Sequence, residues 1–161
     1  MTALDPTLRP EIGADCALQV AALCWRKQHG RVQIILITSR ETRRWVIPKG
    51  WVEPGLTAAA SALREAWEEA GVLGDVGQTA LGCYEYNKII RPTTEQRCSV
   101  SVFPVEVRDL KRRFPERKQR RRQWHDPTEA AALVAEPDLQ ALLRRIGDAP
   151  GLLTGGLLTG R

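Results

Sequence analysis

The chain has 161 residues, 43% of them hydrophobic, and a formal net charge of +5 at pH 7. This length and apolar content suit one globular domain with a real core. The N-terminal sequence has no cationic start followed by an apolar run, and no apolar stretch approaches the roughly 20 residues that a membrane helix needs. We therefore expect a soluble, cytoplasmic protein without a membrane partner.

The positive charge is concentrated in one segment. Residues 108–122 hold nine Lys or Arg and two acidic residues, a local charge of +7, so the rest of the chain sums to −2. One interpretation is a mobile basic loop that draws polyphosphate substrates to a site, and the other is a contact with RNA or DNA. Phe114 is the only aromatic residue of this segment, so stacking platforms for bases are missing and the mobile loop is favoured.

The cysteines and histidines show no metal-ligand spacing. There is no CxxC pair, and neither histidine lies near a cysteine in the sequence. We expect neither a zinc site nor a disulfide framework, but reduced and mostly buried thiols. The residues concerned are Cys16, Cys24, Cys83, Cys98, His29 and His125.

The first half of the chain predicts strands followed by one helix. Residues 1–15 resemble a flexible lead-in. Residues 17–25 and 32–38 are short, apolar and rich in β-branched residues, so they predict two strands that pair as a hairpin. Residues 44–48 can add a brief strand before the loop 48–55. Helix formers then fill 58–70, between the N-cap residue Thr57 and the C-terminal glycine Gly71.

The second half predicts two more strands and two helices. The strands are expected at 78–86 and 98–107, joined by a polar loop at 87–97. The helices are expected at 127–135 and 136–146, each opened by a proline. Strands that bracket one helix and end in helices indicate an α/β layered domain over 16–147. Residues 148–161, which repeat GLLTG, are expected to be a flexible tail or a packing strap.

The helix predicted at 58–70 carries three glutamates on one side. At 100° per residue, Glu65, Glu68 and Glu69 fall within one 100° sector that points away from the core. Arg64 can pair with Glu68 four residues on, which leaves two carboxylates uncompensated. The stripe expected to be buried consists of Ala59, Leu63, Ala66, Trp67 and Ala70.

Two explanations of the acidic sector stay open. One is the solvated face of an amphipathic helix. The other is a metal site, because Glu65 and Glu69 are like charges at i and i+4 near the helix C-terminus, where the helix dipole disfavours anions. Mg²⁺ or Mn²⁺ prefers carboxylate oxygens and would remove both penalties.

The segment GWVEPGLTAAASALREAWEEAGV at residues 50–72 resembles the signature of the Nudix hydrolases. That signature has a glycine, five residues, a glutamate, seven residues, and then Arg-Glu-apolar-x-Glu-Glu-x-Gly-apolar. The spacing matches over all 23 residues. One position departs from the pattern, because Leu56 stands where the family usually has its first glutamate. The resemblance implies that Arg64 then depends on Glu68 or another partner.

The resemblance implies an α/β fold of the Nudix type, an α/β/α sandwich with a mixed β-sheet. It also implies hydrolysis of a diphosphate linked to another group, with Mg²⁺ or Mn²⁺. Carried over by position, Glu65 and Glu69 become the principal metal ligands, joined by a backbone carbonyl near Lys49 or Gly50. Glu68 becomes an additional ligand or the base that takes a proton from the attacking water. Glu65 or a residue outside the signature stays an alternative base.

Two further segments look similar to one branch of that family. SRETRRWVIPKG and RRRQWHDPTEAAALV resemble the diphosphoinositol polyphosphate phosphohydrolases, which also cleave dinucleoside polyphosphates. The first strand departs from this branch, because its cationic residues correspond here to Gln19 or Val20. Positions where those enzymes hold phosphates correspond to Ser39, Arg40, Gly50, Trp51, Arg97 and Arg121.

The residues around the signature also suggest phosphate contacts. Arg40 and Lys49 are expected to bind phosphates, because both cations lie just before the signature and arginine suits bidentate phosphate binding. Arg44 is either a third contact or a surface charge. Other candidates have a structural explanation that fits at least as well, and these are Glu85, Glu95, Trp45, Trp51 and His125.

Together these features predict a Mg²⁺- or Mn²⁺-dependent pyrophosphohydrolase. Its substrate is expected to be a highly phosphorylated small molecule, such as a dinucleoside polyphosphate or a diphosphoinositol polyphosphate. One alternative is an enzyme that removes diphosphate from RNA 5′ ends. Another is a non-catalytic Nudix-like module that binds polyphosphate or RNA. RNA is the less favoured partner, and the sequence does not determine the oligomeric state.

Overall fold

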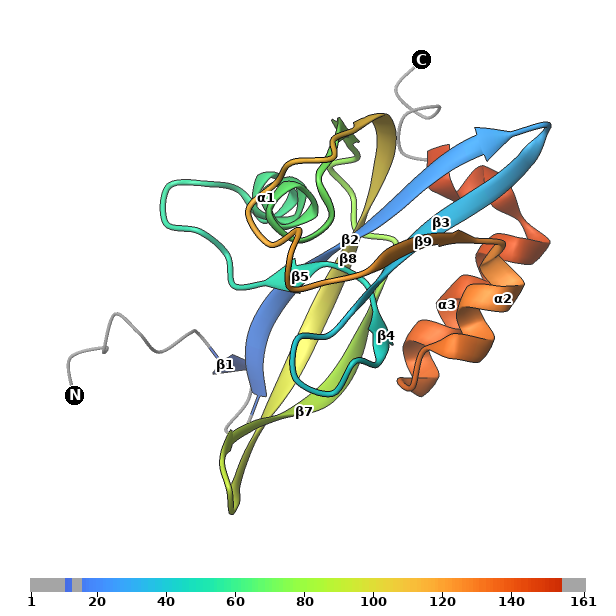
Figure 1. The fold of residues 1–161 in the computed structure, drawn as a ribbon. Helices are drawn as coiled ribbons and strands as arrows, with labels where there is room; N and C mark the ends of the chain where they lie inside the picture. Colours follow the sequence, from blue (N-terminus) through green and yellow to red (C-terminus); the bar gives the residue numbers. More distant parts are fainter. Residues whose placement is uncertain (1–10, 13–15, 155–161) are drawn as a thin grey trace.

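The computed structural model describes residues 11–12 and 16–154. Nine strands in these residues form one mixed sheet whose main path is β4-β3-β2-β8-β6 (Figure 1). Strands β2 and β8 run parallel, and the other pairs are antiparallel. The strands are β1 (Glu11–Ile12), β2 (Cys16–Gln28), β3 (Arg31–Thr38), β4 (Trp45–Val46), β5 (Lys49–Gly50), β6 (Val72–Val76), β7 (Gly82–Arg91), β8 (Thr94–Leu110) and β9 (Arg122–His125).

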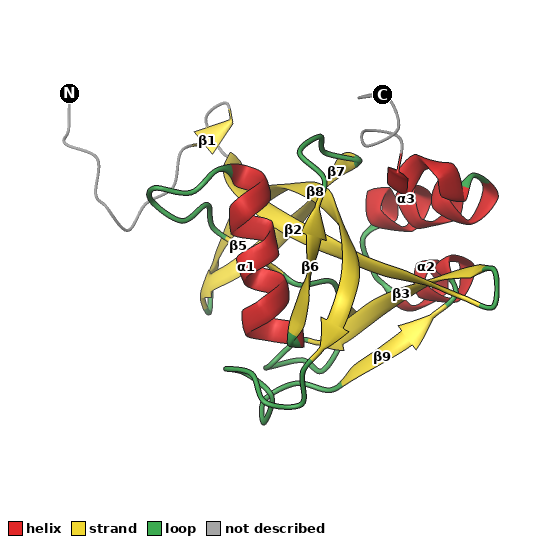
Figure 2. Ribbon diagram, turned by 90° about the horizontal axis from the view of Figure 1, so that it is seen from above, coloured by secondary structure: helices red, strands yellow, loops and turns green. Residues whose placement is uncertain are grey.

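Helices cover both faces of the sheet (Figure 2). Helix α1 (Ala58–Ala70) lies on one face, and α2 (Pro127–Leu133) and α3 (Pro137–Asp148) lie on the other. Strand β3 shows how two cores arise, because its alternate side chains enter opposite layers: Ile35 and Ile37 pack with α1, whereas Ile34 and Leu36 pack with α2 and α3. The predicted α/β/α sandwich with a mixed sheet is confirmed.

Helix α1 begins and ends where its local signals predict. The Thr57 hydroxyl accepts a hydrogen bond from the Ala60 amide at 3.0 Å, and Gly71 adopts the left-handed conformation with φ of 69°. The predicted burial of Trp67 is wrong, because this side chain is only partly buried and lies outside the core. The buried stripe is centred on alanines, Ala62 included, so Trp67 falls at its edge and Glu69 falls inside it.

The predicted hairpin is present. Strands β2 and β3 pair from Trp25↔Ile34 to Gln28↔Arg31, and the turn uses His29 and Gly30, both with positive φ. The predicted brief strand at 44–48 is β4. Strand β5 falls in the segment predicted to be a loop, because its two residues gain their pairing from β2 rather than from their own composition.

The predicted polar loop at 87–97 is wrong. Strands β7 and β8 pair almost to their ends, up to Arg91↔Thr94, so only two residues separate them. Backbone hydrogen bonds form this ladder whatever the side chains are, and a hairpin that stands in solvent keeps polar residues. Strands β6 and β9 were also not predicted, since both are short and take their pairing from distant partners, β8 and β3.

The two ends contain some regular structure. Strand β1, Glu11–Ile12, lies within the predicted lead-in at 1–15 and pairs with β2. Within the predicted tail, a 3-10 helix at Pro150–Thr154 buries Leu153 against the core, so this part packs as a strap because its apolar side chain finds a place beside α3. Residues 1–10, 13–15 and 155–161 lie outside the described residues.

Two expectations from composition can be compared with the described part of the chain. No helix there has the length and apolarity to cross a membrane. The side chains of Cys24, Cys83 and Cys98 are described, and Cys24 and Cys83 are free thiols. Cys24 and Cys98 are buried as predicted, whereas Cys83 is exposed.

Candidate active site

A cleft of about 430 Å³ opens between the turn after β3, strand β5, strand β7 and the C-terminal half of α1. It brings together most of the residues that the sequence singles out. Glu68, Arg97 and Arg121 are the predicted site residues that do not line it. The predicted residues that do are Ser39, Arg40, Arg44, Lys49, Gly50, Trp51, Glu65 and Glu69.

Strand β5 places a glycine directly against a carboxylate of α1. Gly50 pairs with Val20 of β2, and a Cβ atom added at Gly50 would lie 2.5 Å from both Cδ and Oε2 of Glu65. Any larger residue would therefore push the Glu65 carboxylate away from the strand. The glycine at the start of the Nudix-like segment thus sets where this carboxylate lies.

Glu65 and Glu69 form a pair of carboxylates at one end of the cleft. Burial together with the charge of Glu69 raises the pKa of Glu65 to about 8. Burial also raises the pKa of Glu69, although Arg120 opposes this shift. The Lys49 backbone N–H donates to Glu69 Oε1 at 3.2 Å. In the absence of a cation, one of these two buried groups is best kept protonated.

Glu68 points elsewhere. Its Oε2 accepts a hydrogen bond from Arg64 Nε at 2.9 Å, and the same Arg64 atom lies 3.7 Å from Glu53 Oε1. Arg64 therefore has two carboxylate partners although Leu56 replaces the usual glutamate. The expectation that Arg64 relies on Glu68 or another partner is confirmed by these contacts.

The donor set fits a hard divalent cation. Within residues 11–12 and 16–154 no three His, Cys, Asp or Glu side chains converge into a complete metal cluster. Glu65 and Glu69 nevertheless offer adjacent carboxylate oxygens beside a cleft with room for water, and Mg²⁺ typically binds through one or two carboxylates and keeps several waters. A cation there would also favour the charged form of both groups, whose pKa is raised above all by burial.

Cations line the cleft near this acidic pair. Lys49 is partly buried, which lowers its pKa, and its Nζ lies 4.8 Å from the centroid of the Tyr86 ring. Arg44 Nη1 lies 3.5 Å from Glu136 Oε2, and Arg40 Nη1 donates to Gln119 Oε1 at 3.4 Å. The cleft therefore combines the acidic pair of α1 with several positive groups, an arrangement suited to a polyanion held beside a metal.

Residues 111–121, which we call the basic loop, pack against the C-terminal end of α1. The Lys111 amide donates to the Gly71 carbonyl at 2.9 Å, and the Glu116 amide donates to the Glu68 carbonyl at 3.0 Å. Phe114 is buried beneath the Arg122 guanidinium, which lies 4.8 Å from the ring centroid. The predicted mobile basic loop is therefore corrected to an anchored loop, because backbone bonds and an aromatic anchor tie it to α1.

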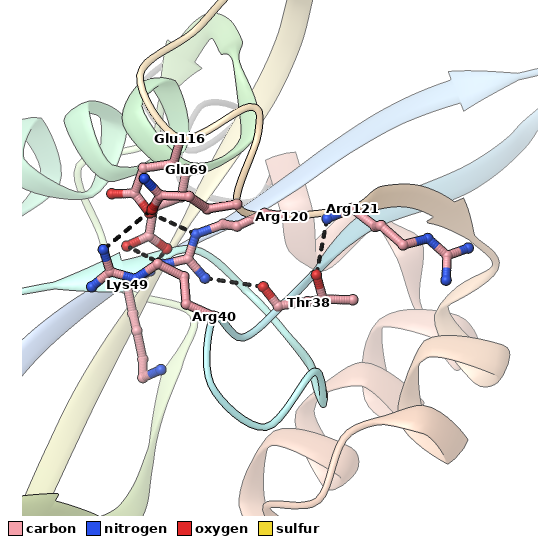
Figure 3. A network of polar contacts seen from close by, with 8 residues as sticks. Thr38, Arg40, Lys49, Glu69, Glu116, Arg120 and Arg121 are labelled. Carbon is pink, nitrogen blue, oxygen red and sulfur yellow. Dashed lines mark hydrogen bonds and ion pairs between the residues drawn. The ribbon is translucent and has the colours of Figure 1, made fainter.

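Arg120 is the residue of this loop that enters the cleft (Figure 3). Its side chain is only 8% exposed, and its nitrogen atoms contact Glu69, Glu116 and the Thr38 carbonyl. The neighbouring Arg121 side chain points away from this network, and its guanidinium lies 5.8 Å from the Trp45 ring centroid. Successive side chains of an extended segment point in opposite directions, so only one of the two arginines can face the cleft. The sequence alone does not say which.

Other residues of the cleft were also not predicted as site residues. The Tyr86 hydroxyl donates to Gln19 Oε1 at 2.6 Å, so a neutral pair occupies the floor of the cleft at the strand position noted for Gln19. Tyr84 and Tyr86 lie two residues apart on β7 and share one face of the strand, and this spacing is the signal that could have indicated an inward-facing Tyr86. Further unpredicted lining residues are Glu41, Thr42, Asn87 and Ile89.

The remaining candidates have structural contacts. Arg97 pairs with Glu85 on the β7–β8 hairpin, outside the cleft lining. His125 is buried with its ring edge-on to Trp45, at 5.5 Å between centroids. Lys88 Nζ lies 5.6 Å from the centroid of the Trp51 ring. Glu95 is exposed on the same hairpin.

The match to known proteins agrees with this geometry. A protein-family model described as the NUDIX domain matches residues 17–146. The chain belongs to the Nudix family. Among curated relatives, the mouse diphosphoinositol polyphosphate phosphohydrolase 3-alpha is 33% identical over 92 residues, 57% of this chain and 52% of that protein. The human diphosphoinositol polyphosphate phosphohydrolase 3-beta is 29% identical over 118 residues, 72% of this chain and 68% of that protein.

Solved structures share the fold of this Nudix domain. The Ap4A hydrolase of C. elegans superposes with a TM-score of 0.59 at 17% identity, covering 81% of this chain and 96% of that one. At this identity the likeness concerns the fold alone. The chain spans about half the length of the first mouse relative that it matches, so activity and substrate are matters of proposal.

Proposed function

We propose that this Nudix protein is a divalent-metal-dependent pyrophosphohydrolase. It hydrolyses a diphosphate bond in a highly phosphorylated small molecule, such as a dinucleoside polyphosphate or a diphosphoinositol polyphosphate. The observation that carries the proposal is the cleft itself, where the paired carboxylates of Glu65 and Glu69 lie beside the cations Lys49 and Arg120. A carboxylate pair needs a cation, and the cationic residues need an anion. A metal-bound diphosphate supplies both.

The residues of the chain divide the work between them. Glu65 and Glu69 hold Mg²⁺ or Mn²⁺, and Lys49, Arg40 and Arg120 orient the phosphate oxygens. The metal ion supplies charge neutralisation of the diphosphate and a lowered pKa for a bound water. Water attacks one phosphorus atom, the bond from that phosphorus to the bridging oxygen breaks, and the second phosphate group leaves with that oxygen.

A carboxylate of α1 takes the proton from the attacking water in this proposal. The resemblance to the Nudix signature leaves Glu68, Glu65 or a residue outside the signature as candidates. Glu65 lines the cleft, whereas Glu68 is bound to Arg64 outside the lining. We therefore assign Glu65 as the better-placed group for proton transfer, with Glu68 as a ligand only if it leaves Arg64.

The substrate class follows from charge and from the relatives. The names of the relatives refer to diphosphoinositol polyphosphates and to Ap4A, and both compounds are polyanions with phosphoanhydride bonds. Cations on the turn after β3, on β5 and on the basic loop suit such a ligand. On the first long strand, the diphosphoinositol branch has cationic residues where this chain has the neutral Gln19–Tyr86 pair. We therefore keep both substrate classes.

One observation supports the RNA 5′ end as a second candidate substrate. The basic loop is fixed at the rim of the cleft and carries exposed cations that do not face the metal site. An anchored cationic surface beside the cleft can follow a longer phosphate backbone. The exposed cations are Lys111, Arg112, Arg113, Arg117, Lys118 and Arg121.

The test is a substrate panel with Mg²⁺ and Mn²⁺, applied to the wild-type protein and to Glu69→Gln. The panel contains inositol pyrophosphates, dinucleoside polyphosphates, nucleoside triphosphates and triphosphorylated RNA. Loss of a metal ligand should lower turnover by more than the roughly 10- to 100-fold that loss of an outer-shell partner costs. Glu95→Gln, an exposed glutamate of the β7–β8 hairpin, serves as the matched control and should keep wild-type turnover.

Two results would contradict the proposal. One is the absence of any phosphate-containing product from the whole panel. The other is turnover by Glu69→Gln equal to that of the wild type. A strong preference for triphosphorylated RNA would instead replace the small-molecule substrate by the RNA 5′ end while keeping the metal chemistry.

A further inference from the structure

We propose that Arg120 is a built-in counter-ion of the metal site. It neutralises Glu69 while no metal is bound, and Glu116 keeps its guanidinium at the cleft once a cation takes Glu69. Glu116 is in this view a positioning residue outside the Nudix signature. The inference rests on the proposed function, because it requires Glu69 to be a metal ligand.

Arg120 contacts Glu69, Glu116 and the Thr38 carbonyl (Figure 3). Of these three partners, only Glu69 is a proposed metal ligand. Arg120 Nη2 lies 3.4 Å from Glu69 Oε2, whereas its Nε lies 2.7 Å from Glu116 Oε1. Its Nη1 donates to the Thr38 carbonyl oxygen at 3.1 Å. The two shorter contacts do not involve the proposed metal ligand. Arg120 can therefore release Glu69 and still have partners.

Charge balance gives a reason for the exchange. Glu69 is 8% exposed and lies beside Glu65, and a buried carboxylate without a partner is strongly unfavourable. Arg120 supplies the nearby positive group, since the Lys49 ammonium lies over Tyr86 and Lys49 meets Glu69 through its backbone N–H. A divalent cation bound to Glu65 and Glu69 would make the Arg120 contact redundant.

Glu116 is suited to hold Arg120 because its own position does not depend on the metal. Its amide donates to the Glu68 carbonyl at 3.0 Å, and its carbonyl accepts from the Gln119 amide at 3.0 Å. The basic loop thereby places the Glu116 carboxylate next to the end of α1. The Glu116 side chain is 21% exposed, so it can accept Arg120 without the cost of a fully buried charge.

The exchange couples metal binding to phosphate binding. Arg120 lines the cleft, so a guanidinium freed from Glu69 faces the space that a substrate phosphate occupies. Coupling between two ligands is reciprocal, so a bound polyphosphate that engages Arg120 should also strengthen metal binding. In the metal-free protein, Glu69 and Arg120 bind each other, so Glu69 is less available to a metal ion and Arg120 is less available to a phosphate.

The experiment measures binding of Mn²⁺ alone by isothermal titration calorimetry. Arg120→Met removes the competitor for Glu69, so Mn²⁺ should bind several-fold more tightly than to the wild type. Glu116→Gln removes the alternative partner and leaves Arg120 on Glu69, so Mn²⁺ should bind more weakly. Arg117→Met changes an exposed cation of the same loop and should leave the affinity unchanged. Equal or weaker Mn²⁺ binding by Arg120→Met would overturn the inference.

Thermal unfolding provides a second readout that does not use activity. In EDTA, Arg120→Met leaves Glu69 without its cation and should unfold at a lower temperature than the wild type. Mn²⁺ should then raise its melting temperature by more than it raises that of the wild type. A melting shift equal to that of the wild type would argue against the exchange. If Arg120→Met does not fold, the opposite response of Glu116→Gln carries the test alone.

The two levels of proposal fail in different ways. If Glu69→Gln binds Mn²⁺ as the wild type does, or the wild type binds none, the metal site and this inference both fall. If Mn²⁺ binding depends on Glu69 but not on Arg120 or Glu116, the proposed function stands and only the counter-ion role falls.

Discussion

The two segments that meet at the cleft, helix α1 and the basic loop, carry opposite charge and are held in place in different ways. Helix α1 is bounded by its own caps at Thr57 and Gly71 and packs a stripe of alanines on the sheet. The basic loop contains no helix or strand, and the end of α1 supplies two of its backbone partners. The helix thus positions its carboxylates by local rules, whereas the loop positions Arg120 only because α1 is already there.

Because of this difference, we expect some substitutions to change metal binding alone and others to change both metal binding and the stability of the fold. A change that displaces a carboxylate of α1 should alter metal binding and leave the fold intact. A change at the junction of α1 and the loop should alter both, because Gly71 and the Glu68 carbonyl are anchors for the loop.

Gly50→Ala should give the largest effect, and the effect should be on turnover rather than on stability. The new Cβ would lie 2.5 Å from the Glu65 carboxylate, which is the far end of a flexible side chain and can move aside. A displacement of about 1 Å can cost on the order of 100-fold in rate. We expect turnover to fall by about that factor, while the free energy of unfolding changes by about 1 kcal/mol or less. Steady-state kinetics and urea unfolding measure the two quantities.

The control for this variant is Gly151→Ala. An added Cβ at Gly151 meets nothing within 4 Å. It should therefore leave both turnover and stability unchanged. Wild-type turnover by Gly50→Ala would show that Glu65 does not need its place against β5.

Gly71→Ala should destabilise the protein at the junction of α1 and the loop. Its φ of 69° is the left-handed region, which costs a residue with a Cβ roughly 1–2 kcal/mol. The Cβ would also lie 2.8 Å from the Lys111 carbonyl and 2.5 Å from Phe114, which are anchors of the basic loop. We expect a loss of about 2 kcal/mol or more in the free energy of unfolding, together with reduced turnover.

Gly30→Ala is the control that separates backbone strain from the contacts of the added Cβ in Gly71→Ala. Gly30 also has a positive φ of 77°, but an added Cβ there meets nothing within 4 Å. The free energy of unfolding should therefore fall only by the cost of the left-handed backbone, and turnover should stay at the wild-type level. If Gly30→Ala and Gly71→Ala had equal effects on stability and activity, the loop would not depend on this junction.

The same contrast explains what the sequence could predict. The bounds of α1 follow from Thr57, a run of helix formers and Gly71, all within one short segment. The hairpin of β2 and β3 follows from two adjacent apolar runs. The pairing of Glu65 with Glu69 follows from helix geometry and the Nudix-like spacing. Signals of this kind are local, so the sequence carries them directly.

The features that could not be predicted depend on distant partners. Arg120 and Arg121 are chemically identical neighbours, and only the path of the chain from Phe114 to β9 decides which one faces Glu69. Strand β5 exists because β2 lies beside it. Glu69 is buried by the sheet and the basic loop, although it belongs to the polar side of the helix by composition. Long-range contacts of this kind leave no periodic pattern.

The acidic pair of α1 should make the stability of the metal-free protein depend on pH. The pKa of Glu65 is about 8 in the folded protein, above its ordinary value of 4.5, so the folded state binds more protons between these values. Stability in EDTA should therefore fall as pH rises from about 5 to about 8. Mn²⁺ should raise the melting temperature more at the upper end of this range, where both carboxylates are charged.

Glu65→Gln is the comparison that isolates this effect. It removes the titrating group, so its melting temperature in EDTA should vary less steeply with pH over the same range. Thermal unfolding at several pH values measures both slopes. Parallel curves for the variant and the wild type would mean that Glu65 is not the source of the pH dependence.

Leu56→Glu, which restores the usual family residue, should have the smallest effect. Leu56 is 39% exposed, and Arg64 already pairs with Glu68 and lies 3.7 Å from Glu53. Exposed ion pairs contribute about 0.2–1 kcal/mol, and a third carboxylate beside the same guanidinium adds less than the first. We expect the free energy of unfolding to change by less than about 0.5 kcal/mol and turnover to stay within about twofold. A rise of tenfold or more in turnover would show that α1 is not positioned by its own caps and partners alone, and that the loop before it limits the site.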